Sequence, residues 1–313
     1  MRSLFRSRKW VKRLLSAIFF TVVAGLLVVL VRSIDWGEVV AAMRRRPVEQ
    51  LAGAALLAAA SHALYSCFDL LGRHVTGHSL KTGRVLAATF VSYAFNLNFG
   101  ALVGGIAFRY RLYSRFGLDV AVVTHILAMS MLTNWLGYVL LAGLVFLGRP
   151  ISLPPDWEFD MAGLRMLGGA LLAAAAAYLL LCAFSRRRLW TIRRQRFVLP
   201  SFRLALVQFG MSSANWLLIA GTIHILLARQ FAFPEVLGIL LIAAIAGVLT
   251  HVPAGLGVIE AVFIGLLSHR IAQGELVAAL LTYRLVYYLV PLAVAAVMYL
   301  TLETGAARRR RHA

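Results

Sequence analysis

The chain has 313 residues, of which 61% are hydrophobic and 14% are charged, and its mean hydropathy is +0.82. Soluble domains are close to half apolar and one quarter charged, so this composition excludes a soluble globular domain and indicates an all-α protein with several membrane spans. Lys and Arg number 32 against 12 Asp and Glu, a formal charge of +20. Because these basic residues lie in tails and loops between apolar segments, the positive-inside rule explains them, and no nucleic-acid partner is expected.

The first half of the chain is predicted to contain two membrane spans, a hairpin and a third span. Residues 1–13 carry six basic residues and are expected in the cytoplasm. The predicted segments are Leu14–Val31 crossing outward, Leu51–Leu71 returning inward, Val85–Phe108 as a hairpin and Ala121–Leu147 crossing outward. The hairpin is predicted because Val85–Phe108 lies between two basic segments, which places both of its ends in the cytoplasm. Leu14–Val31 follows basic sequence as a signal peptide would, but it lacks a small-residue cleavage pattern and is kept as a span.

Three consecutive arginines run against this orientation. Arg44, Arg45 and Arg46 lie in Arg32–Gln50, which is expected outside the membrane. An amphipathic segment lying on the membrane surface would account for them.

The second half is predicted to have the same order of segments with the opposite orientation. The predicted segments are Leu164–Phe184 crossing inward, Leu204–Ala228 crossing outward, Val236–His269 as a hairpin and Leu276–Leu302 crossing inward. Residues 303–313 form a basic tail that is expected in the cytoplasm with the N-terminus. The acidic loop near Asp156 is expected outside.

These segments predict one integral membrane domain, 1–313, with about six full transmembrane helices and two re-entrant hairpins. Residues 1–147, with hairpin 85–108, and residues 163–302, with hairpin 236–269, would be inverted repeats. Repeats with interrupted segments at corresponding positions are typical of transporters. The alternative is eight transmembrane helices, since either hairpin segment is long enough to cross.

Two sets of helix-breaking residues mark the predicted hairpins. They are Pro253, Gly255 and Gly257 in the second hairpin, and Gly104 and Gly105 in the first. Pro removes a helical hydrogen bond and Gly reduces helix stiffness. Irregular backbone at membrane depth is tolerated only where it is covered by protein or lines a polar cavity, so we expect a site at these breaks.

Charged residues near the breaks are the main candidates for this site. Glu260 follows the second break, and at membrane depth a carboxylate costs about 2.5–3.5 kcal/mol. Arg284 lies in the last span beside Tyr283 and Tyr287, and its expected partner is either Glu260 or an anionic lipid headgroup. The alternative for Glu260 and Arg284 is a structural pair that joins the hairpin to the helix.

Other polar residues have both a binding and a structural interpretation. Arg109 follows the first hairpin and either contacts phosphate or is an ordinary cytoplasmic charge. Asn96, with its neighbour Asn98, either faces a headgroup or hydrogen-bonds broken backbone. Gln208, Ser212 and Asn215 share one helix face, which is typical of polar contacts between helices.

The most basic segment of the chain joins the two spans Leu164–Phe184 and Leu204–Ala228. Aromatic and aliphatic residues alternate there with charges, which favours an interfacial helix on anionic lipid, and an ordinary topology-determining loop is the alternative. The arginines concerned are Arg186, Arg187, Arg188, Arg193, Arg194 and Arg196. The sequence has no metal-ligand spacing or nucleotide-binding loop, so no cofactor is expected.

The second interrupted segment resembles that of the lysylphosphatidylglycerol synthase transmembrane family, a flippase-like group with YbhN-type members that lack a soluble synthase domain. The resemblance lies in a Pro, a Gly-rich turn, a Glu and a later Tyr-Arg, here Pro253, Gly255, Gly257, Glu260 and Tyr283-Arg284. The first segment is similar to the family pattern at Asn96, Gly104, Gly105 and Arg109. It lacks the family's Pro, and Ile106-Ala107 occupy the place of an expected acid.

The resemblance implies a bacterial inner-membrane protein of the cell envelope that translocates a lipid or a lipid-linked substrate and does not itself make lysyl-lipid. Its expected partners are membrane lipids, either an anionic phospholipid or a polyprenyl-linked substrate. The headgroup would be bound by Glu260, Arg284 and Arg109 between the two hairpins. The alternative is a non-transporting accessory protein that binds lipids or a biosynthetic enzyme through its Arg-rich cytoplasmic face. An intramembrane enzyme ranks last, because paired acids occur only in the loop near Asp156.

Overall fold

The fold is taken from a computed structural model, which describes residues 46–148, 161–186, 189–192, 195–250 and 257–309 and single positions between 21 and 44. The chain divides into two compact units, Met1–Ala41 and Ala42–Ala313, and the elements below belong to the second unit. Most of the predicted first span, Leu14–Val31, lies outside the described residues. Thr21, Gly25, Val28 and Val29, which are described, are helical.

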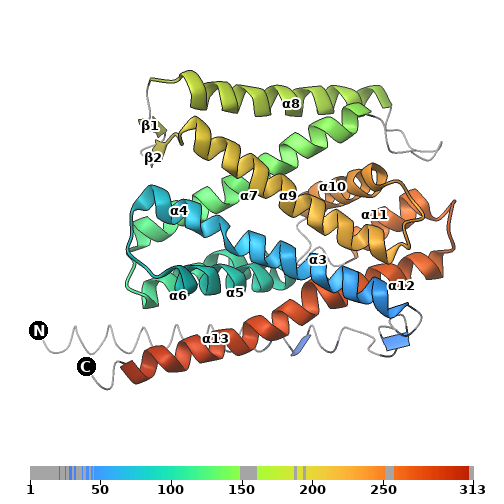
Figure 1. Cartoon of the computed structure of the whole chain (residues 1–313), viewed down its shortest axis with the longest axis horizontal. Helices are drawn as coiled ribbons and strands as arrows, with labels where there is room; N and C mark the ends of the chain where they lie inside the picture. The colour runs from blue at the N-terminus through green and yellow to red at the C-terminus, as the bar shows by residue number, and fades with distance from the viewer. Residues whose placement is uncertain are drawn as a thin grey trace, which may run out of the picture. The chain divides into compact units, whose positions relative to one another are not determined.

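The second unit is built of helices, with one small sheet (Figure 1). Its first elements are α3 (Val48–Ser66), α4 (Phe68–Thr76), α5 (Thr82–Gly100), the π-helical η1 (Ala101–Ala107), α6 (Phe108–Arg115) and α7 (Val120–Gly148). They are followed by α8 (Met161–Phe184), β1 (Leu189–Ile192), β2 (Gln195–Val198) and α9 (Phe202–Leu226). The last elements are α10 (Phe233–Thr250), α11 (Val258–Leu267), α12 (Gln273–Tyr283), the π-helical η3 (Arg284–Leu289) and α13 (Val290–Arg309).

Seven helical segments in the described part of the chain are long and apolar enough to cross a membrane. The prediction of an α-helical polytopic membrane protein is therefore confirmed. From Leu51 onward, each predicted segment overlaps one observed helical segment or one group of consecutive helices. The predicted and observed ends differ by a few residues in most cases and by about seven at most. Mean hydropathy locates a span well because it is a property of the local sequence.

The predicted fold-back in Val85–Phe108 is present, although length and composition alone make Thr82–Arg115 a candidate for one straight span. At Gly100 the backbone has φ 81° and ψ 173°, a conformation that is almost restricted to glycine. After it the chain returns along α5, and the rings of Phe95 and Phe108 stack with centroids 4.0 Å apart. A Cβ atom added to Gly104 would lie 2.0 Å from the backbone nitrogen of Asn96, so the two arms touch through backbone. Figure 1 shows α5 and α6 side by side.

The second hairpin consists of α10 and α11, which pack against each other. Its connecting residues, with Pro253 and Gly255, lie outside the described residues. Gly257 precedes α11 in a left-handed conformation with φ 79°. At the open end of the hairpin, Arg270 Nη1 donates to Glu235 Oε1 at 2.5 Å. The arrangement of both hairpins in a bilayer stays a prediction, as does the inverted repeat.

Polar side chains join the central helices, as the shared face of Gln208, Ser212 and Asn215 predicts. Ser212 Oγ donates to the carbonyl of Asn134 at 2.8 Å, and Asn215 Oδ1 accepts from Ser61 Oγ at 2.7 Å. Gln208 Nε2 donates to the hydroxyl of a threonine on α7 at 2.9 Å. Between these contacts, α7 and α9 approach so closely that a Cβ atom at Gly137 would overlap the Ser212 side chain at 2.3 Å. Small residues and interhelical hydrogen bonds of this kind hold helices together in membranes.

The interfacial helix predicted for the basic segment is wrong. The structure has two antiparallel strands there, with Leu189 opposite Val198 and Ile192 opposite Gln195. The segment LWTI followed by QRFV is rich in β-branched and aromatic residues, which favour paired strands over a helix. Arg186 is exposed just before the strands and Arg196 belongs to β2, whereas Arg187, Arg188, Arg193 and Arg194 lie outside the described residues.

Arg46 has a structural explanation that the sequence did not suggest. Its Nη1 donates to the carbonyl of Leu226 at 2.6 Å, and its Nη2 donates to the carbonyl of Glu275 at 3.2 Å. Leu226 is the last residue of α9, where carbonyls lack helical partners and the helix dipole favours a cation. Arg46 therefore caps a helix.

Candidate functional site

Glu260 and Arg284 form a bidentate ion pair. Glu260 lies in the first turn of α11, and Arg284 is the first residue of η3. Arg284 Nη2 donates to Glu260 Oε2 at 2.8 Å, while its Nε donates to Oε1 of the same carboxylate. Each side chain is 18% exposed. Of the two partners expected for Arg284, Glu260 is the one that contacts it in the structure, and the pair joins the returning arm of the second hairpin to the last span.

The π-helical turn η3 connects this pair to the first hairpin as well. Asn98 Nδ2 donates to the carbonyl of Tyr288 at 3.2 Å and to the carbonyl of Ala94 at 2.9 Å. Tyr288 belongs to η3, so one short segment contacts the second hairpin through Arg284 and the first through Asn98. π-Helical turns inside helices occur frequently at functional sites. The two hairpins therefore share η3 as a common contact.

Tyr283 and Tyr287 are buried and hold η3 against its neighbours. Tyr287 is 1% exposed, and its hydroxyl lies 2.7 Å from Ser61 Oγ and 3.0 Å from the Tyr93 hydroxyl. Tyr283 is also 1% exposed and stacks on Tyr287 with ring centroids 5.4 Å apart. Their hydroxyl and ring contacts are with protein, and they position Arg284.

Arg109, which the sequence places at the same site, belongs to a different ion pair. It is 2% exposed, and its Nε and Nη2 donate to the two carboxylate oxygens of Asp69 at 3.0 and 3.2 Å. Nη2 also donates to Ser130 Oγ at 3.1 Å, and Nη1 donates to the carbonyl of Gly105. The guanidinium is thus enclosed by α4, η1 and α7 and joins the first hairpin to both helices.

Asn96 and the two glycines of the first hairpin are also accounted for by packing. The backbone of Asn96 touches Gly104, and its Oδ1 would lie 3.0 Å from a Cβ atom at Gly105. These positions allow close contact of the two arms. The residues that the structure brings together at the candidate site are therefore Glu260, Arg284, Tyr283 and Tyr287.

Asp69 is the partner of Arg109 that the sequence prediction missed. It is fully buried and also accepts from the Tyr113 hydroxyl at 2.8 Å. The available signal was a single acid inside an apolar span, since such a group requires a cation nearby. In the described residues, no group of three or more His, Cys, Asp or Glu is arranged to hold a metal ion.

Comparison with known proteins identifies related sequences along nearly the whole chain. Residues 14–295 match the family model described as "Lysylphosphatidylglycerol synthase TM region". The Inner membrane protein YbhN of Escherichia coli K12 is 45% identical over 300 residues, which cover 96% of this chain and 94% of that protein. The uncharacterized protein slr0712 of Synechocystis is 31% identical over 279 residues, which cover 88% and 86% of the two chains. A phosphatidylglycerol lysyltransferase of Staphylococcus haemolyticus is 24% identical over 315 residues, which cover 95% of this chain and 35% of that enzyme.

Proposed function

Because this chain belongs to the lysylphosphatidylglycerol synthase TM family, we propose that it translocates an anionic lipid or a lipid-linked substrate across the bacterial inner membrane. The role proposed is transport and not lysyl transfer. The location in the inner membrane is supported by the E. coli relative, which is named as an inner membrane protein.

The observation that carries the proposal is the Glu260–Arg284 pair. An ion pair inside a protein is often no more stable than well-packed apolar residues, so a partly exposed pair at membrane depth is typical of a functional group. A phosphate group presents the same two oxygens to a guanidinium as a carboxylate does. An anionic headgroup would therefore compete with Glu260 for Arg284.

This competition suggests how binding would be coupled to movement. When the headgroup takes the place of Glu260, α11 loses its polar contact with η3. The second hairpin is then free to move relative to the last span, and access changes from one side of the membrane to the other. The return of Glu260 to Arg284 would displace the headgroup and release the lipid.

The proposal is tested with the full chain reconstituted in liposomes that contain fluorescent phosphatidylglycerol. Glu260→Gln should bind the lipid more tightly but translocate it at least tenfold more slowly, because nothing displaces the headgroup. Arg284→Ala should lose both binding and translocation. Arg270→Gln breaks a second ion pair, at the open end of the same hairpin, in which the Arg270 side chain is 39% exposed and that of Glu235 is 7% exposed. It is the matched control, because it removes an ion pair without touching Arg284, and its rate should be near that of the wild type.

Two results would contradict different parts of the proposal. Unchanged translocation in both Glu260→Gln and Arg284→Ala would exclude these residues as the headgroup site. If the wild-type protein moves neither the anionic lipid nor a polyprenyl-linked substrate in the same assay, the transport function itself is wrong.

The basic β-hairpin favours a second candidate, a non-transporting accessory protein. Arg186 is exposed at its base and Arg196 lies in β2, a concentration of charge suited to anionic lipid or to an envelope-lipid biosynthetic enzyme. Neutralising all six arginines of this segment would then abolish function, whereas Glu260→Gln would not. The arginines to be changed are Arg186, Arg187, Arg188, Arg193, Arg194 and Arg196.

A further inference from the structure

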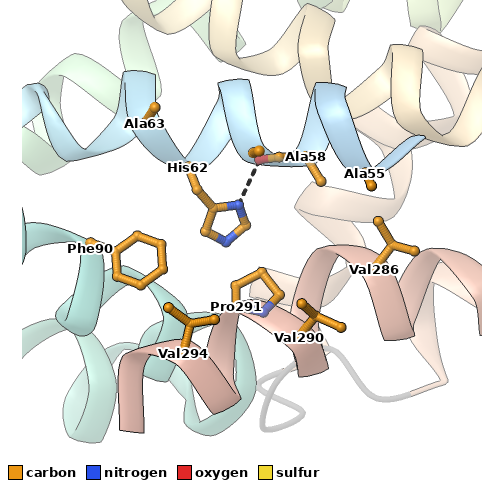
Figure 2. A pocket seen from close by; sticks show the side chains of 10 residues that line it. Ala55, Ala58, His62, Ala63, Phe90, Val286, Val290, Pro291 and Val294 are labelled. Atoms are coloured by element: carbon orange, nitrogen blue, oxygen red, sulfur yellow. Dashed lines mark hydrogen bonds between the residues drawn. The ribbon is translucent and has the colours of Figure 1, made fainter. Parts of the chain in front are cut away.

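An apolar cavity of about 360 Å³ lies between α3, α5 and the η3–α13 segment (Figure 2). Its walls are formed mainly by alanines of α3 and by valines of η3 and α13, with Phe90 at one end. Small-molecule pockets typically have volumes of about 300–1,000 Å³, so this one accommodates a small amphiphile or part of a larger lipid. The cavity is separate from the Glu260–Arg284 pair, neither member of which lines it.

One side of the cavity is open at the molecular surface. Ala59 and Ala63 of α3 and Val290 and Val294 of α13 line it and are exposed at the surface. All four belong to apolar segments that are long enough to span a membrane. A ligand would therefore enter from the bilayer and not from water.

His62 supplies the polar group of the cavity. It is 2% exposed, and Figure 2 shows its ring between Phe90 and Pro291. Its Nδ1 lies 2.9 Å from the carbonyl of Ala58. A carbonyl only accepts, so Nδ1 carries the hydrogen, and the neutral ring presents Nε2 as an acceptor.

This acceptor is unused within the protein. His62 Nε2 is buried and has no hydrogen-bond partner among the residues that the structure describes. A buried polar atom without a partner costs free energy, which a ligand that supplies a donor would recover. Among the described residues that line the cavity, no other side chain is titratable or charged. The rings of Tyr287 and Tyr93 have centroids 4.8 and 5.2 Å from that of His62. Their hydroxyls are bonded elsewhere, that of Tyr287 to Ser61 and that of Tyr93 to Tyr287.

We propose that this cavity binds an uncharged lipid with a hydroxyl group, which donates a hydrogen bond to His62 Nε2. The hydrocarbon part would lie against the alanines and valines. An anionic headgroup fits poorly, because the lone pair of Nε2 repels it and no cation lines the cavity. His62 also lies near the middle of the Val48–Thr76 span. At that depth burying a charged group costs much free energy, whereas burying a hydroxyl that has a hydrogen-bond partner costs little.

The test compares 1-dodecanol with 1-methoxydodecane, which has the same chain but no donor. Both compete with a photoreactive dodecanol for the full chain in nanodiscs, and labelled peptides are identified by mass spectrometry. Labelling is expected on α3 and α13. The alcohol should compete about three- to tenfold more strongly than the ether, which is the usual effect of one neutral hydrogen bond.

Three variants separate the hydrogen bond from the apolar contact. His62→Phe keeps a ring of similar size and should abolish the advantage of the alcohol while the ether competes as before. Ala59→Leu fills the cavity and should weaken both probes. Ala60→Leu makes the same change at the next, exposed position of α3, which does not line the cavity, and should leave both unchanged.

Equal competition by alcohol and ether in the wild-type protein would overturn the proposal without any variant. Labelling that is confined to other helices, or that survives Ala59→Leu at full strength, would also overturn it. Because only binding is measured, these outcomes are independent of whether the protein translocates anionic lipid.

Discussion

Two arginines within apolar spans differ in how fully the protein encloses them. The side chain of Arg109 is 3% exposed and is bonded through Nε, Nη1 and Nη2, whereas the side chain of Arg284 is 18% exposed. A fully enclosed guanidinium cannot reach a headgroup without breaking the hairpin that contains it. We therefore assign Arg109 to the scaffold and keep Arg284 as the candidate binding residue.

This difference leads to a prediction on stability. Asp69→Asn should lower the free energy of unfolding by roughly 3–5 kcal/mol, because it leaves the buried charge of Arg109 without a counter-charge. Thermal unfolding of the purified protein in detergent measures the effect. Asp69→Asn combined with Arg109→Met should recover a large part of the loss.

Glu275→Gln, at an exposed acid outside the core, is the matched control and should unfold near the wild-type temperature. If Asp69→Asn is as stable as this control, the interpretation of Arg109 as a scaffold residue is wrong.

At the scale of elements, the first hairpin depends on one backbone conformation. Gly100 has φ 81° and ψ 173°, and the chain reverses there between α5 and η1. An L-amino acid in this region costs about 1–3 kcal/mol. Asn98 of α5 donates to a carbonyl of η3, and the carbonyl of Gly105 in η1 accepts from Arg109. A distortion at Gly100 would therefore also disturb η3 and the buried Arg109.

Gly100→Ala should therefore destabilise the protein by about 1–3 kcal/mol, measured by thermal unfolding. Gly83→Ala, also in α5, is the control, because Gly83 is helical and a Cβ atom there meets nothing within 4 Å. It should be neutral or slightly stabilising, as alanine is the better helix former. Equal stability of the two variants would show that the reversal does not require glycine.

At the scale of the whole molecule, the hairpins determine the topology. If α5 and the η1–α6 arm form a re-entrant hairpin, the loops on both sides of it lie on one side of the membrane. If Thr82–Arg115 crosses as one helix, they lie on opposite sides. The interarm contacts of Asn96 with Gly104 and of Phe95 with Phe108 support the hairpin.

We predict that Ser79 and Asp119 both face the cytoplasm and that Asp156 faces outward. Single-cysteine variants at these positions, in a background with Cys67→Ser and Cys182→Ser, would be treated in intact cells with a membrane-impermeant maleimide. Only the cysteine at position 156 should be labelled, and the other two should react after permeabilisation. Labelling of just one of the two flanking positions would contradict the hairpin.

The sequence by itself determined the membrane class and the approximate ends of the helical segments, and it offered the fold-back and the Glu260–Arg284 pair as one of two alternatives each. These depend on local hydropathy, on glycines that break a helix, and on the scarcity of charges in apolar spans, which leaves few candidate partners. Only the tertiary structure decided that Arg109 pairs with Asp69, that η3 joins both hairpins, that Arg46 caps α9, and that His62 faces a cavity. Each of these depends on the lateral positions of helices that are distant in sequence, and hydrophobic periodicity carries no information about them. The structure of the basic β-hairpin was also decided only by the tertiary structure. It depends on the pairing of two short strands, which the charge pattern of the segment does not reveal.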